Sequence, residues 1–350
     1  MALLREMDPG ELGLAGRVKP AERNLPRTVL FDGSGARESG VPMDGITTRL
    51  AAGGLFFFAD LHAPDEQDLA SLQREFHFHP LAIEDVRTRH QRPKIDIYGD
   101  QYFLVFYRVG PSAEKDGDWV LQELDFFIGP NFLIVTHDSP VDLLDMTFER
   151  FCREEGKKDV SGLLYDMLDT LVDDYFLFLD DLGERSQEIE DDIFEHYDQS
   201  HLERLLALKK DLALLRRIAA PERDSVNVLL RRDPPILDAA RIFYFQDIYD
   251  HLIRIADSID TYRELATGTL DAFLSVQNNQ LSEVVRKLTI ISTIFLPVML
   301  VTSFFGMNFH WLSNASNAIF ARGMAFMALF EVAIFLFLRY WGILGRRRAG

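Results

Sequence analysis

Two apolar stretches near the end of the chain stand apart from the mixed polar pattern before them. Residues 288–305 contain no charged side chain, whereas residues 323–345 are similar in length but include Glu331 and Arg339. About 20 apolar residues are enough for a helix to cross a hydrocarbon layer. The pattern therefore predicts two transmembrane helices, at residues 288–308 and 323–345, joined by a periplasmic or extracellular loop at residues 309–322.

Basic residues predict the orientation of these spans. Arg286 and Lys287 precede the first span and residues 346–348 are all arginine, whereas the loop between the spans holds only Arg322. Cytosolic flanks are enriched in Lys and Arg, so both termini are expected in the cytosol, with residues 346–350 as a basic tail. The first residues lack the apolar region of a signal peptide. We expect a multi-pass protein of the cell inner (cytoplasmic) membrane.

Earlier in the chain, a mixture of strand-like apolar runs and a helical segment predicts a cytosolic α/β domain over residues 46–155. A helical pattern covers residues 65–76, and strand-like runs occur at residues 55–61, 100–109, 123–129 and 131–137. Residues 1–45 are punctuated by proline and glycine, which is typical of a mobile extension.

Helical periodicity dominates after residue 155. Residues 159–198 are strongly acidic, with Arg185 as the only Lys or Arg, and residues 202–219 form a basic helical pattern. Together they predict an antiparallel hairpin over residues 156–235 with complementary charges, although exposed pairs of this kind contribute little individually.

A very long helical pattern follows this hairpin and meets no strong breaker before Pro297. From residue 238 to 305 it would be roughly 100 Å long at 1.5 Å per residue, which predicts a stalk helix at residues 236–287 that continues into the first span. Its apolar stripe has to be buried, and the economical partner is the same helix of a symmetric neighbour. The stripe consists of Ile242, Phe245, Ile248, Leu252, Ile255, Ile259, Tyr262 and Leu265.

Composition and motifs exclude several classes of function. The chain has 37 Lys and Arg against 55 Asp and Glu, a net charge of −18, which disfavours nucleic-acid binding and suits cations. The single cysteine, Cys152, excludes a disulfide framework or a CxxC site. No Walker, GxGxxG, HExxH or nucleophile-elbow pattern is present, so we expect neither an enzyme nor a bound cofactor. His77 and His79 are a weak candidate zinc pair.

The tripeptide Gly306, Met307 and Asn308 directly follows the first span. Glycine can end a helix, and a symmetric ring of asparagine amide oxygens at the membrane edge could hold hydrated Mg²⁺ through its water shell. Spacing by three or four residues also gives one face that could line a pore, or else pack against neighbouring helices. This face consists of Val285, Leu288, Ser292, Leu296, Met299 and Ser303.

Several longer segments carry a family resemblance, namely residues 79–94, 168–176, 245–265, 261–275 and 281–309. In these segments, and over residues 50–345 in all, the chain resembles the CorA family of divalent metal-ion transporters. The resemblance implies an α+β membrane protein that forms a funnel-shaped homopentamer in the lipid bilayer. The first membrane helix would line its pore, and Mg²⁺, Co²⁺ or Ni²⁺ would permeate.

The resemblance also assigns site residues. It places Gly306, Met307 and Asn308 at the selective mouth and Ser282 in the pore, where relatives have asparagine. It further implies that Mg²⁺ bound between subunits holds the channel shut, so that Mg²⁺ is both substrate and regulatory ligand. Carboxylates that face each other across an interface repel one another when no cation is bound, whereas a bound cation bridges them. The matching positions are Glu84, Asp85, Asp169, Asp173 and Asp247.

Departures from the family pattern keep other functions open. Magnesium-carrying members often have an acidic segment after the signature, whereas no carboxylate lies between Asn308 and Arg322 here, and Met299 replaces a familiar threonine. The zinc-carrying branch that resembles ZntB also lacks that segment, so proton-coupled Zn²⁺ transport is the second reading. A non-conducting, membrane-tethered metal sensor is the third, and its activity would not depend on Asn308.

Overall fold

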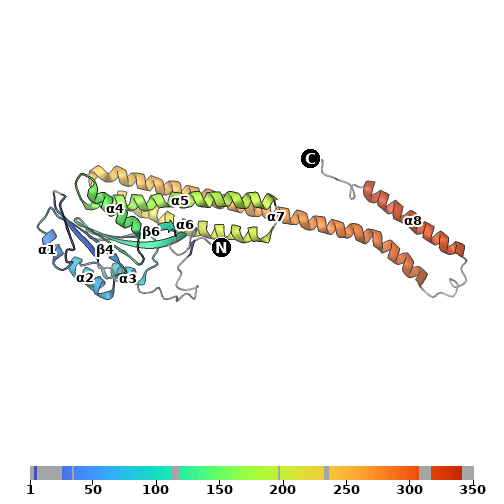
Figure 1. Ribbon diagram of the computed structural model, residues 1–350, viewed down its shortest axis with the longest axis horizontal. Helices are drawn as coiled ribbons and strands as arrows, with labels where there is room; N and C mark the ends of the chain where they lie inside the picture. Colours follow the sequence, from blue (N-terminus) through green and yellow to red (C-terminus); the bar gives the residue numbers. More distant parts are fainter. Residues whose placement is uncertain are drawn as a thin grey trace. The chain divides into compact units, whose positions relative to one another are not determined.

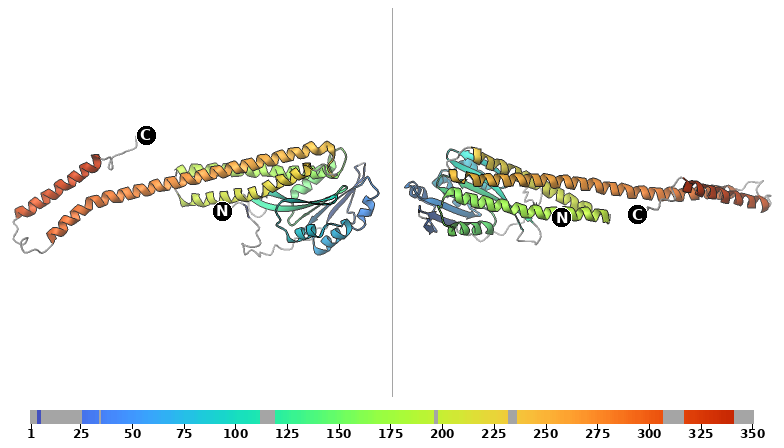
Figure 2. Two further views of the ribbon diagram at one scale, coloured as in Figure 1. Left: turned by 180° about the vertical axis from the view of Figure 1, so that it is seen from behind. Right: turned by 90° about the horizontal axis from the view of Figure 1, so that it is seen from above.

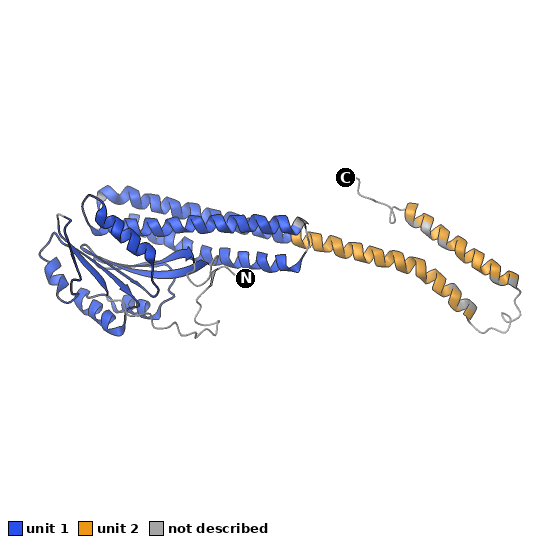
Figure 3. Cartoon of the chain, in the orientation of Figure 1, with its two compact units in different colours: residues 1–271 blue, residues 272–350 orange. Residues whose placement is uncertain are grey.

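The computed structural model describes residues 4–5, 26–33, 35–111, 119–195, 198–231, 236–306 and 317–340. The chain divides into two compact units, residues 1–271 and residues 272–350 (Figure 3). The first unit holds a sheet, helices α1 to α6 and the start of α7. The second holds the rest of α7 and all of α8.

An eight-stranded sheet organises the first unit (Figure 1). Its order is β3-β2-β4-β8-β7-β6-β5, and β1 pairs additionally with β7. The β4–β8 and β1–β7 pairs are parallel and the others are antiparallel. The strands are β1 (Leu4–Arg5), β2 (Arg27–Phe31), β3 (Arg37–Ser39), β4 (Phe56–His62), β5 (Lys94–Tyr98), β6 (Gln101–Pro111), β7 (Trp119–Ile128) and β8 (Phe132–His137).

The four strand runs predicted from the sequence are confirmed as β4, β6, β7 and β8. The mobile extension predicted for residues 1–45 is partly wrong, because β2 and β3 lie within it and pair with the sheet. The run Arg27–Phe31 holds four consecutive buried side chains, of which Thr28 and Val29 are β-branched. Burial of this short run outweighs the glycines and prolines that flank it.

Helices cover both faces of the sheet (Figures 1 and 2). On one face, α1 (Ile46–Leu50), α2 (Glu66–Phe76) and α3 (Pro80–Thr88) share a core with alternate sheet residues such as Phe57 and Ala59. On the other face, Phe58 stacks on Phe148 of α4 (Asp142–Arg153) with ring centroids 4.5 Å apart. The period of two in β4 therefore divides its side chains between two helical layers.

Two histidines of the sequence analysis lie at helix ends. His79 caps α3, its Nδ1 accepting the Leu81 N–H at 3.2 Å, and its ring stacks on Tyr98 at 4.3 Å. His77 ends α2 in the left-handed conformation with φ of 55°. Neither belongs to a potential metal-ligand group among the described residues, so these contacts supply a structural reason for both.

Three long helices follow the sheet along the chain: α5 (Val160–Glu195), α6 (Gln199–Arg231), and α7 (Ile242–Gly306), which follows the short 3₁₀ helix η1 (Ala239–Arg241). Helices α5 and α6 pack against the strands. The expected charge complementarity between α5 and α6 is confirmed by Arg204, which lies 2.6 Å from Asp192 and 3.7 Å from Glu188. Helix α5 lies within the acidic segment predicted at residues 159–198, whereas α6 extends beyond the predicted residues 202–219 and continues through Pro221.

The apolar stripe of α7 is buried within its own subunit. Phe245, Ile248, Leu252, Ile255 and Ile259 are each 0% exposed in a single chain. Their surroundings include α5, where Tyr165 packs edge-on against Phe245 with ring centroids 6.1 Å apart, and where Gly183 gives room to Tyr262. The inference that this part of the stripe needs a symmetric neighbour is therefore wrong, because the stripe is buried within a single chain and α5 supplies part of the partner surface.

A buried carboxyl joins these helices to the sheet. Glu222 of α6 is fully buried, and its Oε1 accepts the Tyr107 N–H at 2.8 Å. The Tyr175 hydroxyl of α5 lies 2.8 Å from Glu222 Oε2 and 3.3 Å from the Tyr107 carbonyl oxygen. Pairing between β5 and β6 ends at Val105. Glu222 and Tyr175 thus replace the missing strand partner of Tyr107.

The second unit contains the remainder of α7, with Pro297 inside it, and α8 (Asn317–Tyr340). Many of its large apolar side chains are exposed, among them Leu288, Leu296, Met299, Phe326 and Leu329. Over the residues that the structure describes, no helix combines the length and the apolar character needed to cross a membrane.

Candidate functional site

A cluster of potential metal ligands lies between α5 and α7. Asp169 of α5 and Asp247 and His251 of α7 each offer one ligand atom, and these atoms all lie within 4.8 Å of one another. Asp247 and His251 are four residues apart, which places them on the same face of α7. Two carboxylates and one imidazole at this separation could bind a divalent cation.

The surroundings hold the imidazole in place. The His251 ring meets the Phe176 ring edge-on with centroids 5.6 Å apart, and its Nε2 lies 3.7 Å from Asp247 Oδ2. Its Nδ1 is buried and has no hydrogen-bond partner within the described part of the chain. A ring that is fixed in this way keeps a nitrogen available next to two carboxylates.

The cluster concentrates negative charge in partly buried surroundings. Burial, followed by repulsion from Asp173 one turn further along α5, raises the pKa of Asp169. Burial and then the carboxylates of Asp169 and Asp247 raise the pKa of Tyr165 to about 12. A bound divalent cation would relieve this repulsion, because it favours the ionised form of each carboxylate.

The structure divides the five predicted regulatory carboxylates into two groups. Asp169, Asp173 and Asp247 lie on α5 and α7, whereas Glu84 and Asp85 lie on α3. Helices α3 and α5 cover opposite faces of the sheet (Figure 1). One chain therefore does not bring the two groups together.

The described positions of the predicted pore face are exposed on α7, all of them beyond residue 271: Ser282, Val285, Leu288, Ser292, Leu296, Met299 and Ser303. Gly306 is the last residue of α7 and is also exposed. Met307 and Asn308, the other two residues of the predicted selective mouth, lie outside the described residues.

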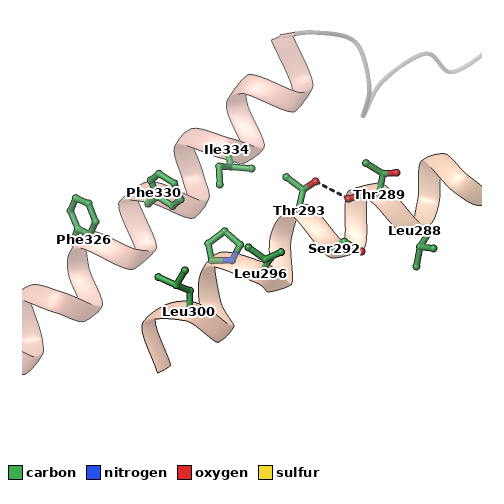
Figure 4. Close-up of a pocket in the computed structure, with 10 residues that line it drawn as sticks. Leu288, Thr289, Ser292, Thr293, Leu296, Leu300, Phe326, Phe330 and Ile334 are labelled. Carbon is green, nitrogen blue, oxygen red and sulfur yellow. Dashed lines mark hydrogen bonds between the residues drawn. The ribbon is translucent and has the colours of Figure 1, made fainter. Parts of the chain in front are cut away.

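Part of this face borders a groove between α7 and α8 (Figure 4). The groove has a volume of about 780 Å³, and Leu288, Ser292 and Leu296 line it together with Phe326 and Phe330 of α8. Its threonines are back-bonded to their own helix, as Thr293 Oγ1 donates to the Thr289 carbonyl oxygen at 2.7 Å. They therefore contribute little polarity to the groove.

His251 is a potential ligand that the sequence analysis missed. The available signal was the spacing of four between Asp247 and His251, which places a carboxylate and an imidazole on one helix face. That spacing alone is common on helices, and only the fold brings Asp169 from a segment about 80 residues earlier into the same cluster.

Three long helices on an α/β sheet, with a carboxylate and histidine cluster between two of them, define an α+β protein with a candidate divalent-cation site. A family model described as "CorA-like Mg2+ transporter protein" matches residues 54–340. The chain belongs to this family, as its sequence resemblance predicted. It is a family of transporters and not of enzymes, which agrees with the lack of catalytic motifs.

Individual relatives agree in sequence and in fold. The chain is 32% identical over 240 residues to the "Cobalt/magnesium transport protein CorA" of Thermotoga maritima, covering 68% of each chain. The CorA magnesium transporter structure from Methanocaldococcus jannaschii is 22% identical, with a TM-score of 0.73, and covers 94% of this chain and 99% of that one. The ZntB cytoplasmic domain of Vibrio parahaemolyticus is 14% identical, with a TM-score of 0.59, and covers 72% and 98%. Both of these solved structures share the fold of this chain.

Proposed function

We propose that this chain transports divalent metal cations, Mg²⁺ and also Co²⁺ or Ni²⁺, across the cytoplasmic membrane. The observation that carries the proposal is the match of residues 54–340 to a Mg²⁺ transporter family. The relative in Thermotoga maritima bears the name of a cobalt and magnesium transporter. The family match runs from the sheet domain to the end of α8, so the proposal concerns both units of the chain.

The proposed topology places residues 288–308 and 323–345 in the bilayer, with both termini in the cytosol. Large apolar side chains support it: Phe295, Leu300, Phe326 and Leu329 are 63%, 65%, 67% and 70% exposed in the single chain. Contiguous apolar surface of this kind is unfavourable in water and calls for lipid or protein around it.

The proposed assembly is a homopentamer whose pore is lined by the exposed α7 positions from Ser282 to Ser303. Five copies of Asn308 would then form a ring of neutral amide oxygens at the outer mouth. Because Mg²⁺ gives up its water reluctantly, such a ring would select the hydrated ion through its water shell. Leu288, Leu296 and Met299 would form apolar rings that close the pore when water leaves it.

In the proposed gating, cytosolic Mg²⁺ binds Glu84, Asp85, Asp169, Asp173 and Asp247 at subunit interfaces and favours the closed state. Since α3 and α5 cover opposite faces of the sheet, a neighbouring subunit is the natural means to bring the two groups of carboxylates together. Without the cation these groups repel one another and the ring loosens.

The test is Mg²⁺ flux through the full chain in liposomes, with Mg²⁺ varied on the cytosolic side. Combined Asp169→Asn and Asp247→Asn should leave flux at low cytosolic Mg²⁺ intact and weaken its inhibition at high Mg²⁺. Asp180→Asn is the matched control, since Asp180 is an exposed α5 carboxylate outside the cluster. Inhibition that is equally strong in the double variant would contradict the regulatory role.

Zn²⁺ transport is the second candidate, and His251 is the observation that favours it. An imidazole beside two carboxylates suits Zn²⁺, Co²⁺ and Ni²⁺ better than Mg²⁺, which prefers oxygen ligands. Zn²⁺ uptake that depends on a proton gradient would support this candidate over the magnesium channel.

A further inference from the structure

The carboxylate of Asp85 is already paired with a cation of its own chain. Lys94 Nζ lies 2.7 Å from Asp85 Oδ2 and 2.8 Å from Asp96 Oδ2. The side chains of Asp85, Lys94 and Asp96 are 17%, 35% and 34% exposed. A divalent ion that approaches Asp85 therefore meets an ammonium group at the same carboxylate.

The fold fixes this pair more firmly than an ordinary surface ion pair. Lys94 and Asp96 are two residues apart on β5, so their side chains share one face of the strand. Strand β5 is paired along its length with β6. The stacking of His79 on Tyr98 also joins the start of α3 to the end of β5.

The loop between α3 and β5 is anchored as well. Arg89 NH1 lies 2.7 Å from the buried Asp125 Oδ2, and Arg89 Nε lies 3.0 Å from Asp138 Oδ1. The Gln91 N–H donates to Glu123 Oε2 at 3.0 Å. Lys94 is thus delivered to Asp85 by a preorganised loop, and little side-chain entropy is left to lose.

We propose that Lys94 is a positioning residue that competes with the divalent cation for Asp85 and so sets the ion concentration at which the cytosolic domain responds. This inference rests on the regulatory role proposed for Asp85. Two cations at one carboxylate repel each other, so ion binding displaces the ammonium. Asp96 supplies the place to which the ammonium retreats, because it already contacts Lys94 at 2.8 Å.

The electrostatics of the triad agree with this exchange. Burial by itself lowers the pKa of Lys94, but hydrogen bonds to Asp85 and Asp96 outweigh burial and the pKa is raised. The ammonium therefore stays charged throughout the physiological range. Removing Asp96 should leave Lys94 with Asp85 alone and strengthen the competition, whereas removing the lysine charge should abolish it.

The experiment is limited proteolysis of the full chain in detergent during a Mg²⁺ titration, with the half-protecting concentration as the readout. Lys94→Met should lower that concentration by about fivefold or more, and Asp96→Asn should raise it by a similar factor. Lys94→Arg, which keeps the charge, should restore a wild-type value. Lys157→Met is the matched control, because Lys157 also lies near two carboxylates, Asp159 at 3.3 Å and Asp238 at 3.6 Å.

If the half-protecting Mg²⁺ concentration falls in Lys94→Met and rises in Asp96→Asn, the effect is competition. Simple damage to the fold would lower the metal-free melting temperature without moving the two half-protecting concentrations in opposite directions. If Mg²⁺ protects the wild type but Lys94→Met has the same midpoint, the inference is overturned and the regulatory role stands. If Mg²⁺ protects neither protein, the regulatory role itself fails. Should Lys94→Met not fold, the Asp96→Asn midpoint decides, and an unchanged or lower value overturns the inference.

Discussion

The buried Glu222 carboxyl leads to a prediction that a pH series can check. Burial raises the pKa of Glu222 well above its usual value, so the folded chain keeps a proton on this carboxyl at pH values where a free glutamate has lost it. The Tyr107 N–H donates to Glu222 Oε1, and the Tyr175 O–H lies within donating distance of both Glu222 Oε2 and the Tyr107 carbonyl oxygen. Glu222→Gln keeps an acceptor for the Tyr107 N–H and places an amide N–H against the Tyr175 oxygen, whose O–H can then donate to the Tyr107 carbonyl, without a titrating group.

The expected magnitude follows from proton uptake on folding. Between the unfolded pKa of about 4.3 and the raised folded pKa, the folded state binds one more proton than the unfolded state, so wild-type stability falls as pH rises. The Gln variant lacks this contribution. Relative to the wild type, the free energy of unfolding of Glu222→Gln should therefore rise with pH above about 4.3, by at most about 1.4 kcal/mol per pH unit, until the folded pKa of Glu222 is reached.

A second variant separates the charge from the hydrogen bonds. Glu222→Leu also lacks the titration, but it leaves the buried Tyr107 N–H without its acceptor, which costs about 1–3 kcal/mol at every pH. In thermal unfolding of the detergent-solubilised chain, the melting temperature of the Leu variant should therefore follow the same pH dependence as that of the Gln variant, but at lower values. A difference in stability between the wild type and Glu222→Gln that stays constant from pH 5 to pH 8 would refute the reasoning.

Three further predictions concern packing, protonation and metal preference. Gly183→Ala should lower the thermal midpoint because its Cβ would lie 2.7 Å from the Tyr262 hydroxyl, whereas Gly268→Ala, with no atom within 4 Å, should leave it unchanged or raise it slightly. His137→Gln should destabilise the chain at pH 6 and less so as pH rises. Burial alone lowers the pKa of His137, but its hydrogen bonds to Asp60 and the Ser139 carbonyl raise it, so the stabilisation by the charged imidazole is full below about pH 6.5 and is lost as pH rises through the folded pKa. Equal losses of unfolding free energy at pH 6 and pH 9 in urea unfolding would contradict this. His251→Ala should weaken Co²⁺ protection against protease more than Mg²⁺ protection, because only Co²⁺ gains from the imidazole; equal losses for both ions would exclude His251 as a ligand.

Local periodicity was sufficient for much of the fold. Strands β4, β6, β7 and β8 and helix α2 were predicted because their apolar positions repeat with the period of the element. Strand β5 was missed, since it is only five residues long and its residues are only partly buried. The long helices α5 and α7 were predicted close to their observed bounds, whereas α6 was predicted too short, because Pro221 lies inside it.

Tertiary contacts could not be read in the same way. The stripe of α7 showed that a partner surface must exist, but periodicity does not say whether α5 of the same chain or a second subunit provides it. Likewise, Asp169 and Asp247 could be singled out individually, whereas their approach to His251 depends on how α5 packs on α7. The Lys94 pair with Asp85 arises from the loop anchored by Arg89, and no local sequence pattern reports it.

The central claim is tested most directly by uptake of Mg²⁺ and Zn²⁺ into liposomes that contain the full chain, with and without a proton gradient, for the wild type and Asn308→Ala. We predict Mg²⁺ entry that is independent of the gradient and is lost in Asn308→Ala. Zn²⁺ entry driven by protons would contradict the magnesium channel in favour of the zinc reading, and the absence of flux for either ion would contradict transport altogether and leave a metal sensor.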